Sequence, residues 1–172
     1  MKMKETERKL IYELMKNCRQ SDSELAKTIG ASQPTVTKTR RKLEKNGIIK
    51  EYALIPDFGK LGFDIMAFTF IRYRTELSDD EYHEVKKTAK KYERQFSTAY
   101  LMAVRGMGLG CDRAFVSFHE DYSSYTRMLA QLRQQPFTAI TDIQSFLVSL
   151  KGMEHYQPLT FSIMANYLLS KK

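Results

Sequence analysis

The chain has 172 residues, enough for one domain or two small ones, and a net charge of +8. Its two cysteines, Cys18 and Cys111, have no CxxC spacing, which excludes a disulfide framework and indicates a reducing cytoplasm. No apolar run is long enough to cross a bilayer, and the first nine residues lack an apolar core, so we expect neither a membrane contact nor a signal peptide.

The positive charge is concentrated in the first third of the chain. Residues 1–55 hold 13 Lys and Arg against seven Asp and Glu, whereas residues 56–172 hold 15 against 13. A local surplus of cations attracts the phosphates of nucleic acid. We therefore expect residues 1–55 to bind DNA and the remainder to serve another purpose.

Three short helices are predicted in this basic segment. The first covers residues 6–18, where apolar residues recur at helical spacing. Ser21 and Glu24 form a capping box that begins the second helix, and Gly30 supplies the left-handed residue that ends it. Ser32 caps the third helix after so short an interval that the two helices must cross steeply, as in a helix-turn-helix.

The third helix has a buried side and a basic side. Val36 and Leu43 point the same way and define the buried side, while Pro34 is tolerated in the first turn. In a helix-turn-helix the early residues of the second helix of the pair enter the major groove of DNA. We expect the DNA contacts to come from Ser32, Gln33, Thr35, Thr37, Lys38, Arg41, Lys42 and Lys45.

Arg40 does not fit this division of the helix. It falls one turn after Val36, on the side predicted to be buried. Either Thr39 fills the seam while Arg40 extends outward along its aliphatic stem, or Arg40 meets a carboxylate of the first helix. Glu7 and Glu13 are the two candidates for that carboxylate.

The third helix is expected to stop at Gly47. Residues 48–52 are rich in β-branched and aromatic side chains and are predicted to form the first strand of a short wing. Residues 1–55 would then be a winged helix-turn-helix domain. Proline, aspartate and glycine cluster in residues 56–63, which we expect to be a hinge.

The second half of the chain has the pattern of a mixed α/β domain. Strands are predicted at 65–73, 98–105, 113–118 and 143–150, with helices at 78–95 and from Asp121 to about Pro136. The order strand–helix–strand–strand–helix–strand is typical of a ferredoxin-like fold. The sequence therefore predicts an α+β protein, with an N-terminal winged helix-turn-helix followed by a ferredoxin-like βαββαβ domain over residues 64–151.

This second domain is predicted to form a dimer. A sheet with helices on one side only must cover its other face, and a second copy of the chain is the simplest partner. A homodimer would carry two recognition helices. We expect it to bind a pseudo-palindromic site in double-stranded DNA, with half-sites one helical turn apart or a multiple of that.

Residues 25–63, LAKTIGASQPTVTKTRRKLEKNGIIKEYALIPDFGKLGF, resemble the DNA-binding half of the Lrp/AsnC (feast/famine) transcription regulators. The order of elements that follows resembles their ligand-sensing RAM domain, so that the resemblance covers roughly residues 5–150. It implies a dimer that can assemble into higher homo-oligomers. It also implies regulation by an amino acid or related small metabolite bound between RAM domains.

A glycine-rich segment departs from the family pattern. The short Gly-x-x-Asp turn between the second and third RAM strands is stretched to residues 105–112. The resemblance implies that Gly106, Gly108, Gly110 and Asp112 contact an effector. The other interpretation is a mobile hairpin turn. A glycine loop that binds nucleotide phosphates should lead from a strand into a helix, whereas this one joins two strands.

Two further features depart from the family pattern. Arg40 stands where the family usually has an apolar residue. Residues 152–172 extend beyond the fourth strand and are too apolar to remain in solvent. We expect this extension to form an edge strand or a short amphipathic helix that packs on the second domain or on the dimer partner.

We expect no enzymatic activity, no cofactor and no metal. His83, His119 and His155 are scattered without ligand spacing, and no nucleophile–base or carboxylate pair is evident. Some relatives of this architecture resemble sirohaem decarboxylases, but they tend to lose the basic recognition face that this chain keeps. The other alternative is a weakly specific, chromatin-like DNA-binding protein.

Overall fold

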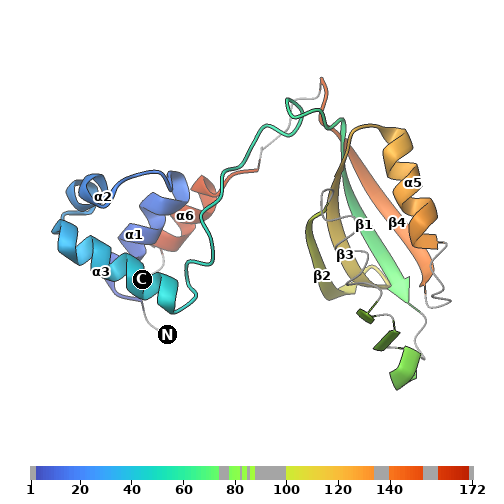
Figure 1. Cartoon of the computed structure of the whole chain (residues 1–172), viewed down its shortest axis with the longest axis horizontal. Coiled ribbons are helices and arrows are strands. Elements are labelled where there is room, and N and C mark those ends of the chain that lie inside the picture. The colour runs from blue at the N-terminus through green and yellow to red at the C-terminus, as the bar shows by residue number, and fades with distance from the viewer. Residues whose placement is uncertain are drawn as a thin grey trace. The chain divides into compact units, whose positions relative to one another are not determined.

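The computed structural model describes residues 3–73, 78–81, 83–84, 86–87, 100–133, 140–152 and 159–170. The chain divides into two compact units, whose elements are labelled in Figure 1. Unit 1 comprises Met1–Ile55 and His155–Lys172, and unit 2 comprises Pro56–Glu154. The predicted α+β fold class is confirmed, because unit 1 is helical and unit 2 contains a four-stranded antiparallel sheet.

Unit 1 consists of α1 (Glu5–Lys16), α2 (Asp22–Ile29), α3 (Gln33–Lys45) and α6 (Ser162–Ser170). The capping box predicted for α2 is present: Ser21 Oγ accepts a hydrogen bond from Glu24 N at 3.2 Å, and Glu24 Oε2 accepts one from Ser21 N at 2.7 Å. Gly30 ends α2 with a φ of +70°. The buried core of the first three helices contains Leu10, Leu14, Leu25, Ala26, Val36 and Leu43.

Residues 48–52 do not form the predicted wing strand. The backbone N–H groups of Ile48 and Ile49 donate to the Leu43 carbonyl, at 2.9 and 3.2 Å, and both side chains pack half-buried against the core. A strand needs a neighbouring strand for its backbone groups. Here those N–H groups close the C-terminus of α3 instead, so that the segment continues the helical core.

The C-terminal extension forms α6, which packs along α1 inside unit 1 (Figure 1). We expected the extension to pack on the second domain or on a dimer partner, and for α6 this expectation is wrong. The helix carries no charged residue, and its Ala165 is completely buried. Its composition requires an apolar surface to cover, but does not specify which surface, and α1 provides one within the same unit.

Unit 2 contains one sheet in the order β2-β3-β1-β4, with every neighbouring pair antiparallel. Its strands are β1 (Ile65–Tyr73), β2 (Tyr100–Gly108), β3 (Cys111–His119) and β4 (Ile140–Ser149). Phe68 of β1 lies opposite Val116 of β3 on one side and Phe146 of β4 on the other. This is the strand order of the predicted ferredoxin-like domain.

Helix α5 (Tyr122–Arg133) covers one face of the sheet. It lies along the sheet in Figure 1. Its Tyr125 and Met128 pack against Ala67, Ile71 and Phe115. The other predicted helix begins next to Ser78, as expected. A capping box that was not predicted lies there, in which Glu81 Oε2 accepts a hydrogen bond from Ser78 N at 2.9 Å. Residues 79–81, 83–84 and 86–87 are helical, and the rest of that prediction lies outside the described residues.

The opposite face of the sheet is apolar, and in the part of the chain that the structure describes it is open except near Phe118, which the Phe58 ring covers. Side chains of a strand alternate between faces, so Phe68 and its partner Phe146 point away from α5, with their rings 6.4 Å apart. Met102 and Val104 of β2 lie on the same face and are exposed. Phe146 exposes 65% of its surface.

Residues 56–63 form a compact turn that belongs to unit 2. The Phe63 N–H donates to the Phe58 carbonyl at 3.1 Å, and the Phe58 ring stacks on Phe118 of β3 with a centroid distance of 3.8 Å. We expected a hinge here because turn-forming residues cluster in the segment. The rings of Phe58 and Phe63 both contact Phe118, so these residues pack against the sheet, and the hinge stays a prediction.

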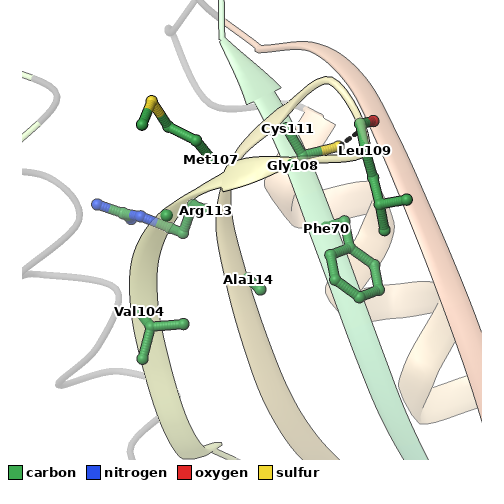
Figure 2. Close-up of a pocket in the computed structure, with 9 residues that line it drawn as sticks. Phe70, Val104, Met107, Gly108, Leu109, Cys111, Arg113 and Ala114 are labelled. Atoms are coloured by element: carbon green, nitrogen blue, oxygen red, sulfur yellow. Dashed lines mark hydrogen bonds between the residues drawn. The ribbon is translucent and has the colours of Figure 1, made fainter.

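The glycine-rich segment is mostly strand. β2 and β3 are joined by the two residues Leu109 and Gly110, whose φ angles of +53° and +65° suit a tight hairpin (Figure 2). The register of the ladder shifts between Arg105 and Gly108, which accommodates the extra residues. The stretched loop expected over 105–112 is therefore wrong, because residues 105–108 and 111–112 belong to the two strands and only Leu109 and Gly110 form the turn.

Candidate functional site

The exposed side of α3 is the first candidate site. Ser32 caps the helix, its Oγ accepting from Thr35 N at 3.3 Å, and Gln33 and Thr35 are exposed beside it. Farther along the helix, Lys38, Arg41 and Lys45 are exposed, and their side chains make no ion pair or hydrogen bond with any other described residue. Six of the eight predicted DNA-contacting residues thus share one accessible surface, which we call the α3 surface: Ser32, Gln33, Thr35, Lys38, Arg41 and Lys45.

The other two predicted residues are engaged inside unit 1. Thr37 Oγ1 donates to Asp22 Oδ2 at 2.6 Å, and Lys42 Nζ lies 2.7 Å from Glu7 Oε1. Glu7 is buried, while the Lys42 side chain remains 54% exposed. Both residues therefore hold α3 to another helix, so they are less available to a ligand than the α3 surface.

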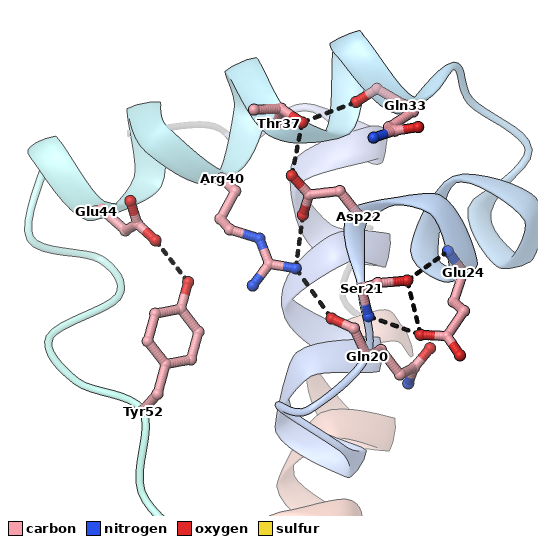
Figure 3. A network of polar contacts seen from close by, with 9 residues as sticks. All are labelled: Gln20, Ser21, Asp22, Glu24, Gln33, Thr37, Arg40, Glu44 and Tyr52. Atoms are coloured by element: carbon pink, nitrogen blue, oxygen red, sulfur yellow. Dashed lines mark hydrogen bonds and ion pairs between the residues drawn. The ribbon is translucent and has the colours of Figure 1, made fainter.

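Arg40 meets neither of its two predicted carboxylates. Its Nη2 lies 2.7 Å from Asp22 Oδ1, at the start of α2, and also donates to the Gln20 carbonyl at 3.3 Å (Figure 3). Sequence reasoning considered only acids of the first helix and missed Asp22. The available signal was its position directly after the capping Ser21, which places it in the turn that crosses α3.

The charge of the chain divides sharply between the units. Unit 1 holds 15 Lys and Arg against seven Asp and Glu, because α6 and its flanking residues add two lysines and no acid. Unit 2 holds 13 of each. The whole net charge of +8 therefore belongs to the unit that carries the α3 surface, which favours a polyanionic ligand there.

One acid of unit 1 is held in its charged form. The Lys42 ammonium and the Lys4 N–H, at 2.7 and 2.8 Å, donate to Glu7 and hold the pKa of its carboxyl below the ordinary value. Glu7 thereby stays ionised at neutral pH although it is buried. It anchors the start of α1 to α3.

The hairpin end of the open sheet face is the second candidate site. A cavity of about 230 Å³ lies there, and its lining is mainly apolar (Figure 2). Its walls come from Phe70, Val104, Gly106, Met107, Gly108, Leu109, Cys111, Arg113 and Ala114. In Figure 2 the Arg113 side chain extends away from Phe70, so this cation is not directed into the apolar part of the cavity.

The four residues predicted to contact an effector are divided by this geometry. Gly106 and Gly108 line the cavity, whereas Gly110 and Asp112 do not. Asp112 Oδ2 accepts a hydrogen bond from Tyr73 N at 2.8 Å, and the Gly110 carbonyl accepts one from Arg72 Nε. The last two therefore fasten the hairpin to β1. Sequence reasoning missed the apolar residues that line the cavity. Their signal in the sequence is the large apolar residues between the glycines, Met107 and Leu109, which the structure leaves exposed.

The histidines and possible metal ligands are the remaining polar groups to consider among the described residues. Among the described residues no group of three or more His, Cys, Asp or Glu is placed to hold a metal ion. His119 is buried with its Nε2 2.8 Å from Ser117 Oγ, and burial lowers its pKa. His155 lies outside the described residues. Within the described part of the chain, no helix has the length and apolar character needed to span a membrane.

Comparisons of sequence agree with the α3 surface. A family described as winged helix-turn-helix DNA-binding matches residues 3–50. The chain is 43% identical over 65 residues to the HTH-type transcriptional regulator LrpC of Bacillus subtilis, covering 38% of this chain and 45% of that one. It is 30% identical over 101 residues to an uncharacterized HTH-type transcriptional regulator of Pyrococcus abyssi, covering 53% and 68%. The chain spans about half the length of most curated relatives that it matches.

Comparisons of structure extend over nearly the whole chain. A transcriptional regulator from Neisseria meningitidis, solved as a complex with L-Met, matches with a TM-score of 0.73 at 20% identity, covering 95% of this chain and 99% of that one. AsnC of Escherichia coli matches with a TM-score of 0.72 at 18% identity, covering 93% and 98%. At this identity the likeness establishes the shared fold.

Proposed function

The chain belongs to the Lrp/AsnC family of HTH-type transcriptional regulators, and from this premise we propose that it binds a specific DNA operator through α3. The α3 surface, on the unit that holds the whole net charge, is the observation that supports the proposal. The relatives are regulators, and we propose that this chain likewise acts by binding in the cytoplasm rather than as an enzyme.

The two parts of the α3 surface suit different parts of DNA. Ser32, Gln33 and Thr35 lie at the N-terminus of α3, where short polar side chains and helix amides can reach base edges and a nearby phosphate. Lys38 and Arg41 follow, and their cations, which pair with no other described residue, can meet the DNA backbone. Phosphate contacts of this kind supply affinity and register, while base contacts supply sequence preference.

We propose that the open sheet face of unit 2 joins two copies of the chain. Exposed Met102, Val104 and Phe146 make this face apolar, and an isologous pair would remove it from water. A homodimer, or a higher homo-oligomer built from it, brings two α3 helices to one DNA. Its operator would be a pseudo-palindrome whose half-sites are separated by whole helical turns.

We also propose that a small metabolite modulates the protein at the cavity beside the hairpin. The solved Neisseria meningitidis regulator is a complex with L-Met. In this chain the apolar lining, with Phe70, Val104 and Leu109, favours a ligand with an apolar group such as an amino-acid side chain. A cavity of about 230 Å³ has room for a small molecule of that kind.

Selection of genomic DNA fragments by the purified full-length protein tests the main proposal. A regulator should prefer its selected operator over a scrambled duplex by about a thousandfold or more at fixed salt. Equal affinity for both duplexes would contradict it and would favour the weakly specific, chromatin-like alternative. Repeating the selection with candidate amino acids tests the effector, because a modulator must change the affinity for the operator.

A further inference from the structure

We propose that Asp22 and Arg40 fix the rotation of α3, so that this pair controls which side chains read DNA sequence. The inference rests on the proposed DNA binding through α3. It assigns a positioning role to two residues that do not belong to the α3 surface. These two residues should affect the preference for one DNA sequence over another, but not the attraction of the protein to DNA phosphates.

Asp22 contacts two side chains of α3. One carboxylate oxygen accepts from Thr37 Oγ1 at 2.6 Å, and the other lies 2.7 Å from Arg40 Nη2 (Figure 3). Thr37 and Arg40 are three residues apart and therefore lie on the same side of the helix. Two contacts to one carboxylate, spaced along the axis, oppose both rolling and sliding of α3 against α2.

Arg40 is held from the opposite side as well. Its guanidinium carbon lies 5.8 Å from the centre of the Tyr52 ring, and Tyr52 Oη donates to Glu44 Oε1 at 2.7 Å. The Arg40 Nη2 also donates to the Gln20 carbonyl at 3.3 Å. The side chain thus lies between the start of α2 and the segment after α3, both of which are visible around it in Figure 3.

The Arg40–Asp22 ion pair is partly buried, with 18% and 21% of the two side chains exposed, and its hydrogen bonding is incomplete. Arg40 Nε is buried and has no hydrogen-bond partner among the residues that the structure describes. A buried unpaired donor is unfavourable, and replacing a buried ion pair by apolar residues is often neutral or stabilising. We infer that the pair serves to fix the rotation of α3 relative to α2. An apolar contact fixes this rotation less strictly because it has no preferred direction.

The geometry links the pair to the DNA-facing residues. Lys38 directly follows Thr37, and Arg41 directly follows Arg40. One position along a helix is a rotation of about 100° around its axis. With Thr37 and Arg40 held inward, Lys38 and Arg41 point outward. If the contacts of Asp22 with Thr37 and Arg40 are lost, α3 can rotate about its axis. The polar side chains at its N-terminus then no longer lie opposite the base edges that they read.

The test uses the full-length protein, the selected operator and a scrambled duplex of the same length and composition. Asp22→Asn and Arg40→Met each remove the ion pair, and the double variant removes both charges together, so that no uncompensated charge remains in the seam. Glu5→Gln is the matched control, because it removes one acid from the exposed Glu5–Lys9 pair of the same unit without touching α3.

We expect each Asp22 or Arg40 variant to lower the preference for the operator over the scrambled duplex by about tenfold, the effect of losing one good base contact. Binding to the scrambled duplex and its salt slope should stay within about twofold, and Glu5→Gln should change neither. Arg40→Lys, which keeps a charge for Asp22, should retain more preference than Arg40→Met.

Three results would overturn the inference. One is an unchanged preference in the double variant while thermal unfolding shows it to be folded. Another is a parallel loss of affinity for both duplexes that follows the drop in melting temperature, which would make the pair merely structural. The third is a wild-type protein without any operator preference, and this result alone would also refute the proposed function.

Discussion

The lysines of α3 differ in what their charges do within the folded chain. Lys38 and Lys45 have no ion-pair partner among the described residues, whereas the Lys42 ammonium lies 2.7 Å from the buried Glu7 carboxylate. A free surface cation can meet a phosphate without losing a protein contact. Lys42 would first have to leave an acid that is not itself exposed to water, and that loss opposes its use in binding DNA.

Lys38→Ala and Arg41→Ala are therefore expected to weaken operator binding about three- to tenfold each at moderate salt, with the salt slope reduced by about one when a phosphate contact is lost. The melting temperature should stay unchanged. Gel-shift titrations over a salt series measure both quantities. Lys60→Ala is the matched control, since it removes an exposed lysine of unit 2, and unchanged affinity in both α3 variants would contradict the assignment.

Glu7 makes the stability of unit 1 sensitive to acid. The hydrogen bonds from Lys42 and Lys4 lower the pKa of this carboxyl in the folded chain. A group with a depressed folded pKa stabilises the fold above its unfolded pKa, near 4.3, and loses that contribution as pH falls through the folded pKa. Protonation of Glu7 should thus loosen α1 from α3 in acid.

Glu7→Gln is expected to lower the free energy of unfolding by about 1 kcal/mol at pH 7, the scale of a lost charge-assisted hydrogen bond. The difference from wild type should shrink toward zero below the folded pKa of Glu7, because wild-type Glu7 is then uncharged as well. Urea unfolding at pH 7 and at successively lower pH values checks this. A difference that stays constant with pH would show that the Glu7 charge has no part in the effect.

At the scale of elements, α6 is part of unit 1 although it comes last in the chain. It packs along α1, and the segment Pro56–Glu154 is thus inserted between two pieces of unit 1. Ala165 is fully buried, whereas its neighbour Asn166 is exposed. The helix also leaves Ile163, Met164 and Tyr167 more than half exposed, so only part of its apolar surface is covered within the unit.

Ala165→Arg is expected to detach α6, because Ala165 is completely buried and a long charged side chain there would be overpacked and removed from water; the loss should exceed about 2 kcal/mol. Hydrogen exchange read by mass spectrometry should show faster exchange in both α6 and α1. Asn166→Arg is the matched control, with the same new charge one position away in solvent. Equal protection of α6 in both variants would rule out the observed packing as a source of stability.

At the scale of the whole molecule, charge and apolar surface are separated. Unit 1 holds the entire net charge of +8, while unit 2 is neutral and presents the open sheet face. A neutral apolar face can associate with a second copy without repulsion between like charges. Association through unit 2 leaves the cations of unit 1 free for DNA, and two linked α3 helices bind far more tightly than one.

Phe146→Asp should therefore convert the protein to a monomer and weaken operator binding by about a hundredfold, the scale of lost avidity. Phe146 is 65% exposed on the open face, so the change should leave the fold of unit 2 intact. Sedimentation velocity gives the oligomeric state. Gln131→Asp, an exposed position on α5, is the control, and a dimer that persists in Phe146→Asp would place the interface elsewhere.

Structural features that depend on residues close together in the sequence were predicted correctly. The capping box at Ser21, the left-handed Gly30, the helix start at Ser78 and the buried Val36 depend on residues within about one helical turn. The order of strands and helices, and with it the fold class, followed from the same local periodicities. The prediction of a wing strand was wrong because a strand requires a partner strand, which local sequence does not reveal. The N–H groups of Ile48 and Ile49 instead donate to the nearby Leu43 carbonyl.

By itself, the sequence determined that a basic helix-turn-helix precedes an α+β sheet domain, because capping, periodicity and net charge are written into short stretches. Only the tertiary structure decided that Arg40 pairs with Asp22, that Lys42 is taken up by Glu7, and that α6 returns to α1. These contacts join residues far apart in the chain. Several partners were chemically equivalent in the sequence, and the packing of the fold chose among them by bringing one within reach.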